Sequence, residues 1–439
     1  MMAEVAYFSR LRRWLTFGSV IALTTGAARA QFPEIFEGAP DHPAIGYPQP
    51  SHDPVAELNR KIQEGGVELR YDETAGYLRA VLEALHIPIE SQIVAYSKTS
   101  VQGYRINPKN PRSLFFNDSV VVGWVNGGFI EVAAQDPKQG VIFYTLEQSR
   151  AYRLDADLNR DYKHYFQRKD MCLGCHISYA TLGVPGMLVR SVFPDANGSP
   201  LYQAGSFVTD HRLPMNQRWG GWYVTGKDEA VVHLGNGTLA DVDHPETMEG
   251  KVALTSLKSR FDTNQYLSSY SDIAALMVFD HQMRMMNLLT RVNWEARFGL
   301  SQQSSGLSTR LREAASEFVD YLLFIDEAPL EAPIHGSSGF AERFSAQEPR
   351  DGRGRSLRQL DLNHRLQKYP CSYMIYSAAF DALPAEAKEA IYRRMWDVLS
   401  GGEKGARYAR LTSGDRQAII EILCDTKKGL PDYFNRTPR

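Results

Sequence analysis

Residues 114–144 read LFFNDSVVVGWVNGGFIEVAAQDPKQGVIFY. Short runs of β-branched and aromatic residues fill this stretch, and runs of that composition are typical of strands. Two glycine-containing turns, residues 126–128 (NGG) and 136–140 (DPKQG), separate the later runs, and such turns join antiparallel neighbours. The stretch therefore predicts an antiparallel sheet, with strands at Leu114–Phe116, Val120–Val125, Phe129–Val132 and Val141–Tyr144.

The strand pattern extends outward from this stretch, from about residue 92 to residue 234. Met187–Phe193 and Leu201–Val208 flank a turn that contains proline, asparagine and glycine, and they predict a second hairpin. Trp222–Thr225 and Ala230–Leu234 flank a Gly-Lys-Asp turn and predict a third. The interval Gln148–Val184 interrupts the strand pattern.

Helical patterns lie on both sides of this β-rich region. Asp53, as N-cap, and Pro54, at the first helical position, predict a short helix that ends near Gly65. The other predicted helices are Ala75–Ala84, a helix behind the N-cap candidate Ser271, Leu311–Ile325, Pro384–Ser400 and Ser413–Lys427. Two aperiodic segments remain, an extended arm at Gln31–Asp53 and a surface loop at Gly336–Arg355.

These patterns predict an α+β fold. We expect an N-terminal arm with short helices at 31–90, an antiparallel β-rich domain at 91–246 and a mainly helical domain at 247–439. Residues 1–30 form no part of these domains, because they have the features of a signal peptide.

The N-terminus carries a positive segment followed by an apolar one. Arg10, Arg12 and Arg13 precede the apolar run Trp14–Ala28, and Ala28-Arg29-Ala30 matches the small-residue site of signal peptidase. The alternative is an uncleaved membrane anchor, but the run is shorter than the roughly 20 residues that span a bilayer. The sequence therefore predicts export to the periplasm, with Gln31 as the first mature residue and no membrane span after cleavage.

The overall composition is that of a globular protein. The chain has 439 residues, of which 43% are hydrophobic and 23% charged, which argues against disordered and coiled-coil proteins. The formal net charge is −2, or −5 after cleavage, and the basic residues form no dense run. A nucleic-acid partner is therefore not expected.

The interrupting segment contains the pentapeptide Cys172-Leu173-Gly174-Cys175-His176. Two thiols at this spacing can add to the two vinyl groups of haem, and the adjacent imidazole can bind the iron. Three other interpretations use the same residues: a structural zinc site, a thioredoxin-like redox pair and a plain disulfide. A zinc site needs more ligands than the pair supplies, and a thioredoxin-like pair needs a long helix, which residues 183–186 (GVPG) would break.

The pentapeptide resembles the haem-attachment motif of the c-type cytochromes. The resemblance implies one covalent haem c, held by Cys172 and Cys175, with His176 as the axial iron ligand. It covers only these five residues, and the chain departs from small class I cytochromes in its length, its central motif and its strands. A β-rich haem-attachment fold, similar to that of the cytochrome c′-beta family, is the better structural analogy.

The sixth iron ligand is less well specified. His211 is the leading candidate, because it follows a predicted strand and lies between Asp210 and Arg212. The alternatives are His233, His164, Met187, Met215 or an open position. Haem propionates could pair with nearby arginines, and the candidates are Arg190, Arg212 and Arg218.

Two cysteines remain outside the motif. An even number of remaining cysteines in an exported protein favours a disulfide, here between Cys371 and Cys424. Apolar neighbours would suit two buried thiols as well.

The hypothesis that follows is an exported mono-haem cytochrome that transfers one electron to or from a redox protein or a small molecule. The alternatives are a haem enzyme with an open iron site, acting on a small oxidant or nitrogen species, and a haem-based sensor. Whether the protein is an enzyme stays open at this point, with electron transfer favoured.

Overall fold

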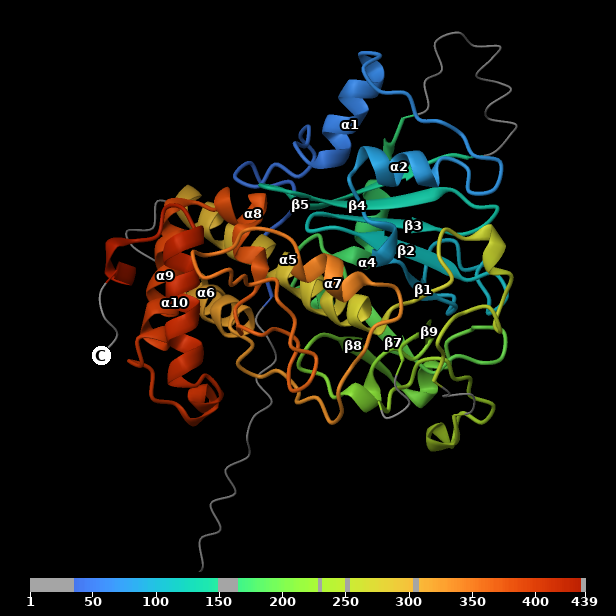
Figure 1. Ribbon diagram of the computed structural model, residues 1–439. Helices are drawn as coiled ribbons and strands as arrows, with labels where there is room; N and C mark the ends of the chain where they lie inside the picture. The colour runs from blue at the N-terminus through green and yellow to red at the C-terminus, as the bar shows by residue number, and fades with distance from the viewer. Residues whose placement is uncertain (1–34, 149–164, 228–230, 249–252, 303–307, 436–439) are drawn as a thin grey trace, which may run out of the picture. The chain divides into compact units, whose positions relative to one another are not determined.

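An antiparallel sheet organises the fold (Figure 1), in the strand order β6-β5-β4-β3-β2-β1-β9. The computed structural model describes residues 35–148, 165–227, 231–248, 253–302 and 308–435. Within those ranges the sheet has seven strands. They are β1 (Ile93–Ala95), β2 (Arg112–Phe116), β3 (Val120–Trp124), β4 (Ile130–Asp136), β5 (Gly140–Leu146), β6 (Gln167–Arg168) and β9 (Trp222–Tyr223). A separate pair is formed by β7 (Val189–Val192) and β8 (Ser206–Thr209).

The four central strands form where the sequence predicts them, and two of the three turns that join them satisfy their own backbone. Asn117 Oδ1 accepts from the backbone N–H groups of Ser119 and Val120 between β2 and β3. Asp136 Oδ1 accepts in the same way from Lys138 and Gln139 between β4 and β5. Such Asx turns reverse the chain without help from distant residues.

Helices cover both faces of the sheet (Figure 1). Along β4, Ile130, Val132 and Ala134 pack in one hydrophobic cluster with α1 (Pro54–Gln63) and α2 (Leu78–Ala84). Ala133, on the opposite face, packs in a second cluster with α5 (Ile273–Ser301). The alternation follows from the two-residue period of a strand, which sends successive side chains to opposite faces.

The remaining helices extend the cluster around α5. They are α6 (Thr309–Leu322), α7 (Phe340–Ser345), α8 (Ala378–Asp381), α9 (Ala385–Leu399) and α10 (Ser413–Thr426). A short helix, α4 (Leu173–His176), lies between β6 and β7 and carries the cysteine motif. The fold is therefore α+β, as predicted, with the motif in a segment that interrupts the strands.

Contacts between residues divide the chain into two units, 1–33 and 34–439. The first unit, which contains the predicted signal peptide, lies outside the described residues. The second unit contains the sheet and all of the helices named above. Within it, the hydrophobic cluster around α5 includes side chains from the sheet and from the helices. The expected boundaries after residues 90 and 246 stay predictions. Among the described residues, no helix combines the length and hydropathy of a membrane span.

Several local predictions are wrong, each because a distant segment competes. β9 pairs with β1, and residues 231–234 form no strand, so the described part of the third hairpin does not form; residues 228–230, which include part of its predicted turn, lie outside the described residues. Asp272, not Ser271, caps α5, and its carboxylate accepts from the N–H of Ala274. Ser271 instead accepts from Val94 N–H and donates to the Tyr223 carbonyl, and so ties β1 to β9.

Two predicted loops are also more ordered than expected. The N-terminal arm buries Phe36, Ile45 and Tyr47 in the core beneath α1 and α2. The segment predicted as a surface loop at 336–355 contains α7, whose Phe340 and Phe344 are buried. Apolar side chains in an aperiodic segment still gain free energy when they are buried.

Candidate functional site

The cysteine motif forms a single helical turn. A 3-10 turn at Asp170–Cys172 leads directly into α4, and Cys172 itself has helical dihedral angles, φ −61° and ψ −26°. Leu173 packs against the hydrophobic clusters on both sides of the sheet, whereas Gly174 and Cys175 are exposed. The turn is therefore anchored by its leucine and presents its second thiol to solvent.

The imidazole of His176 is held through one nitrogen. Its Nδ1 lies 2.8 Å from the carbonyl oxygen of Gly186, so Nδ1–H donates and Nε2 carries the lone pair. Among the described residues, Nε2 has no hydrogen-bond partner. Burial lowers the pKa of His176 and so favours the neutral ring. Histidines that bind metals have this arrangement, with one nitrogen donating to a carbonyl and the other free.

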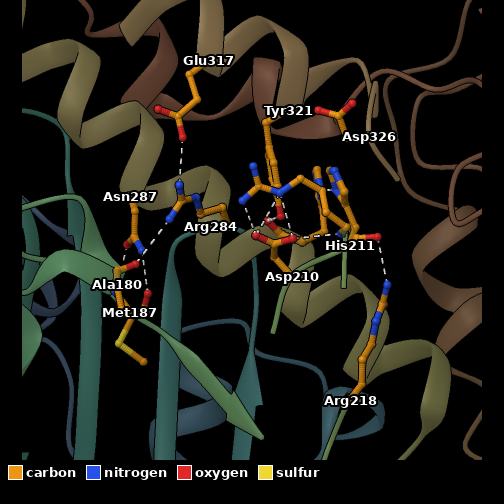
Figure 2. A network of polar contacts seen from close by, with 12 residues as sticks. Ala180, Met187, Asp210, His211, Arg218, Arg284, Asn287, Glu317, Tyr321 and Asp326 are labelled. Carbon is orange, nitrogen blue, oxygen red and sulfur yellow. Dashed lines mark hydrogen bonds and ion pairs between the residues drawn. The ribbon is translucent and has the colours of Figure 1, made fainter. Parts of the chain in front are cut away.

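Asn287, on α5, fixes the carbonyl that orients His176. Its Oδ1 accepts from the N–H of Met187 at 3.0 Å, and its Nδ2 donates to the Met187 carbonyl at 2.7 Å. Figure 2 shows this pair of bonds beside the Arg284 side chain, which donates to the Ala180 carbonyl. A Cβ atom on Gly186 would lie 2.2 Å from Asn287 Oδ1, so this position requires glycine. The backbone on the C-terminal side of the motif is therefore clamped to α5.

The sheet presents a polar end next to the motif. The His176 ring lies 4.5 Å, centre to centre, from the Phe143 ring on β5. Glu131 on β4 is the diagonal neighbour of Phe143, since Glu131 pairs with Thr145 and Ala133 with Phe143. Glu131 forms an ion pair with Arg112 on β2. Both charged side chains are mostly buried.

His211 lies elsewhere in the interior, at the end of β8. Its Nδ1 is 2.8 Å from Nδ1 of His281 on α5, and the His281 Nε2 is 2.7 Å from Ser372 Oγ. The His211 ring stacks on Tyr321 with a centroid distance of 4.0 Å. In the described part of the chain, none of the residues that contact the His211 ring contacts the His176 ring, so the structure does not bring the two histidines together.

The other proposed ligands are committed to different contacts or lie beyond the described residues. The side chains of Met187 and Met215 are both packed in the core around α5. His233 is packed against Trp219, and burial lowers its pKa to about 4. His164 lies outside the residues that the structure describes.

The three arginines considered for propionates also have partners of their own. Arg212 forms an ion pair with Asp210 at 2.6 Å, and Arg190 donates to Ser206 Oγ at 3.2 Å. Arg218 is buried and donates to the carbonyl of His211 at 2.9 Å, as Figure 2 shows. None of these contacts is to a residue of the motif.

Arg218 also faces a buried carboxylate. Its Nη1 lies 3.8 Å from Asp280 Oδ2, which accepts from Trp219 Nε1 at 2.9 Å. Burial raises the pKa of Asp280 to about 8, although Arg218 and Trp219 act in the opposite direction. Burial thus favours the protonated form of Asp280, whereas Arg218 and Trp219 favour the carboxylate.

All four cysteines are free thiols in the structure. Cys371 is fully buried, and burial raises the pKa of its thiol. Cys424 is exposed on α10 and lies 3.7 Å from the Phe434 carbonyl. The Cys371–Cys424 disulfide stays a prediction for the exported, oxidised protein.

Three residues of this site, Arg112, Glu131 and Asn287, are not predicted by the sequence. Asn287 leaves a weak signal, because it is polar within a helix whose apolar residues predict burial. Arg112 and Glu131 leave none, because charged residues on strands are ordinary at solvent-exposed positions.

Comparisons with known proteins add no family to this description. No protein-family model, no curated protein and no solved structure matches the chain.

Proposed function

We propose that the protein is a mono-haem c-type cytochrome that acts as a one-electron carrier. The observation that supports this most strongly is the state of His176. Its Nδ1 is committed to the Gly186 carbonyl, and its Nε2 has no partner among the described residues, next to two unpaired thiols in the same helical turn. This is the arrangement that a covalently attached haem requires.

The rival interpretations of the motif find less support. Across the described residues, no group of three or more His, Cys, Asp or Glu side chains is gathered as for one metal ion, which a structural zinc site needs. A thioredoxin-like pair opens a long helix after a buried strand, whereas α4 ends at His176. The two thiols are free, so they do not form a plain disulfide in this structure.

The residues present fit a haem. Cys172 and Cys175 would hold it by thioether bonds, and His176 Nε2 would bind the iron. The haem would supply a one-electron redox couple when bound. The protein holds the imidazole in one tautomer through Gly186, and Leu173 fixes the turn to the core.

An exposed attachment site favours electron transfer. Cys175 is exposed, and Met171, the residue before Cys172, is 78% exposed. A haem attached at this turn would present an edge to solvent and to a redox partner protein or small molecule. Export through residues 1–30 is part of the proposal and places the protein in the periplasm, the side on which the c-type cytochromes acquire haem.

A haem enzyme or sensor is the second candidate function. One observation favours it: the His211 ring packs against Tyr321 and Phe324, away from the residues that contact His176. Its Nδ1 is bound to His281, and its Nε2, although without a hydrogen-bond partner among the described residues, would reach an iron at the motif only after rearrangement. An iron site without a sixth protein ligand could bind a small oxidant or a gas. The optical spectrum separates the two, since a low-spin haem supports the carrier and a high-spin haem supports an enzyme or sensor.

The test of haem attachment uses protein made together with a c-type maturation system. We expect coloured protein whose mass includes one haem after denaturation, and loss of that mass in the Cys172→Ala/Cys175→Ala double variant. Cys371→Ala is the matched control, because it removes a thiol outside the motif and should keep the haem. Folded, colourless wild-type protein under these conditions would refute the proposal.

A further inference from the structure

The connection between β1 and β2 is much longer than the pairing of these strands requires. They are antiparallel neighbours, with Ala95 paired to Arg112, and all of residues 96–111 lie between them. Hairpin loops usually have about 2–5 residues, and loops beyond about 12–15 residues are usually either functional or disordered. We call residues 96–111 the β1–β2 loop.

Buried side chains anchor the β1–β2 loop to the sheet. Gln102 is fully buried, and its amide bonds to the backbone of Phe129 in both directions: Nε2 donates to the carbonyl at 3.0 Å and Oε1 accepts from the N–H at 3.0 Å. Ile106 is fully buried as well, and Ser100 Oγ donates to Glu131 at 2.8 Å. The loop is therefore ordered, and its length favours a function.

The anchored loop presents two apolar side chains to solvent. Val101 and Tyr104 occupy central positions of two consecutive turns, residues 100–103 and 102–105, which are closed by backbone hydrogen bonds of 2.8 and 2.9 Å. Val101 is 63% exposed and Tyr104 is 73% exposed. A single exposed apolar residue needs no explanation, but these two lie three positions apart on a loop that is held from its other side.

The same loop carries positive charge that no carboxylate balances. It contains Lys98, Arg105 and Lys109 and no aspartate or glutamate, although the whole chain has a net charge of −5 after the predicted cleavage. Within the described part of the chain, none of the three forms an ion pair. Their charged groups contact a serine hydroxyl, the Tyr104 ring and a backbone carbonyl, respectively. Their charges are therefore available to an anionic partner.

We propose that the β1–β2 loop binds the surface of a lipid bilayer that contains anionic lipids. Val101 and Tyr104 would enter the headgroup region, and the three cations would contact the headgroups. Tyrosine is enriched at the boundary between lipid and water, because its ring is apolar and its hydroxyl is polar. Lysine and arginine can lay their apolar stems along the same boundary while their charges stay in water. The proposal is independent of haem, because no residue of the cysteine motif takes part.

The small extent of the loop favours a membrane over an acidic protein. A stable protein interface buries roughly 800 Å² on each partner, and two apolar and three like-charged side chains on one loop supply only part of such an area. A membrane surface requires only shallow insertion and positive charge. Each lysine or arginine near an anionic surface strengthens binding about fivefold, so the loop should bind weakly and reversibly.

The test measures how much protein sediments with vesicles of two compositions, pure phosphatidylcholine and an equal mixture of phosphatidylcholine and phosphatidylglycerol. Exported protein is used, with the loss of residues 1–30 confirmed by mass, because their apolar run could itself bind lipid. Three cations together should give roughly a hundredfold preference for the mixed vesicles. High salt should abolish that preference, because ions screen the attraction.

Variants at exposed positions test the two parts of the loop separately. Arg105→Gln and Lys109→Gln should each weaken binding to the mixed vesicles about fivefold, whereas Lys404→Gln, at an exposed position on another segment, should leave it unchanged. Val101→Ser should weaken binding several-fold. Its control is Val232→Ser, because Val232 is also 63% exposed.

Three results would overturn the proposal. The first is equal binding to the two kinds of vesicle, and the second is equal weakening by the loop variants and their controls. The third is absence of binding to both kinds of vesicle, which would assign the positive loop to an acidic protein instead.

Discussion

Asn287 makes two hydrogen bonds to the backbone of Met187, one from each end of its amide. The residue before Met187 is Gly186, whose carbonyl accepts from His176 Nδ1. A side chain on the buried helix α5 thus determines the orientation of the imidazole in the motif. Because the contact is indirect, Asn287 is a positioning residue, and its loss should affect the histidine as well as the fold.

Substitution of Asn287 should change both stability and the haem spectrum. Asn287→Ala leaves the N–H and the carbonyl of Met187 without partners, which costs about 1–3 kcal/mol for each buried group. The matched control is Asn293→Ala, which removes an amide on the same helix that donates to the Pro137 carbonyl. Urea unfolding should show a loss in both variants, and only Asn287→Ala should shift the haem absorption and midpoint potential. Equal spectra in the two variants would contradict the positioning role.

A methyl group at Gly186 should disrupt the same clamp. Gly186→Ala places Cβ against Asn287 Oδ1, and overpacking of this kind typically costs about 1–3 kcal/mol. Gly174→Ala is the control, because a Cβ at Gly174 meets no atom within 4 Å. Thermal unfolding should show a lower melting temperature for Gly186→Ala and little change for Gly174→Ala. A stable Gly186→Ala variant with an unchanged haem spectrum would show that the clamp can relax.

The His211 side chain should matter for stability. His211→Ala removes the ring that stacks on Tyr321 and leaves His281 Nδ1 without its partner. We expect a loss of several kcal/mol, as for other large buried side chains cut back to alanine, and an unchanged haem spectrum. If His211 instead binds the iron, the variant will convert a low-spin spectrum to high-spin and will bind carbon monoxide. Optical spectra of the two proteins, with and without carbon monoxide, separate these outcomes.

Asp280 should make the stability of the protein fall as the pH rises. The pKa of Asp280 is about 8 in the folded protein, against 3.8 for an ordinary aspartate. Between these pH values the folded protein keeps a proton that the unfolded chain releases. The stabilisation that this proton gives the folded state is therefore lost as the pH rises toward 8. Asp280→Asn mimics the protonated form and does not titrate.

The free energy of unfolding of Asp280→Asn, relative to wild type, should therefore rise steadily between pH 4 and pH 8. Urea unfolding at four pH values measures this difference, and the other titrating groups cancel in it. Asp243→Asn, at an exposed position, is the control and should give a flat difference. A flat difference for Asp280→Asn would mean that the carboxyl group is ionised in the folded protein.

The two thiols outside the motif provide a test of the predicted disulfide. Cys371 is buried and Cys424 is exposed on α10, and both are free. If export oxidises the pair, peptide mapping without reductant should recover Cys371 joined to Cys424. If both thiols alkylate in denatured, unreduced protein, the disulfide does not form and Cys371 is only a core residue.

The central strands and most helices could be predicted from the sequence because their determinants are local. Asn117 and Asp136 build their own turns, and Asp53 caps α1 from the adjacent position. The pairing of β9 could not be predicted, because Trp222 and Tyr223 have strand character but nothing in their neighbourhood specifies β1 as the partner. The role of Ser271 was hidden for the same reason, since its partners Val94 and Tyr223 are distant in sequence.

The candidate site divides along the same line. The haem-attachment motif from Cys172 to His176 could be predicted from the sequence, because the spacing of its two thiols and its imidazole is a property of one helical turn. Which nitrogen of His176 is free, and which charges face it, depend on Gly186, Asn287 and the Arg112–Glu131 pair. Arg112, Glu131 and Asn287 come from β2, β4 and α5, and only the burial of apolar side chains between the sheet and α5 brings them to the motif. Hydrogen bonds within a turn form between neighbours in the chain, whereas the hydrophobic effect is non-directional and joins segments irrespective of their separation.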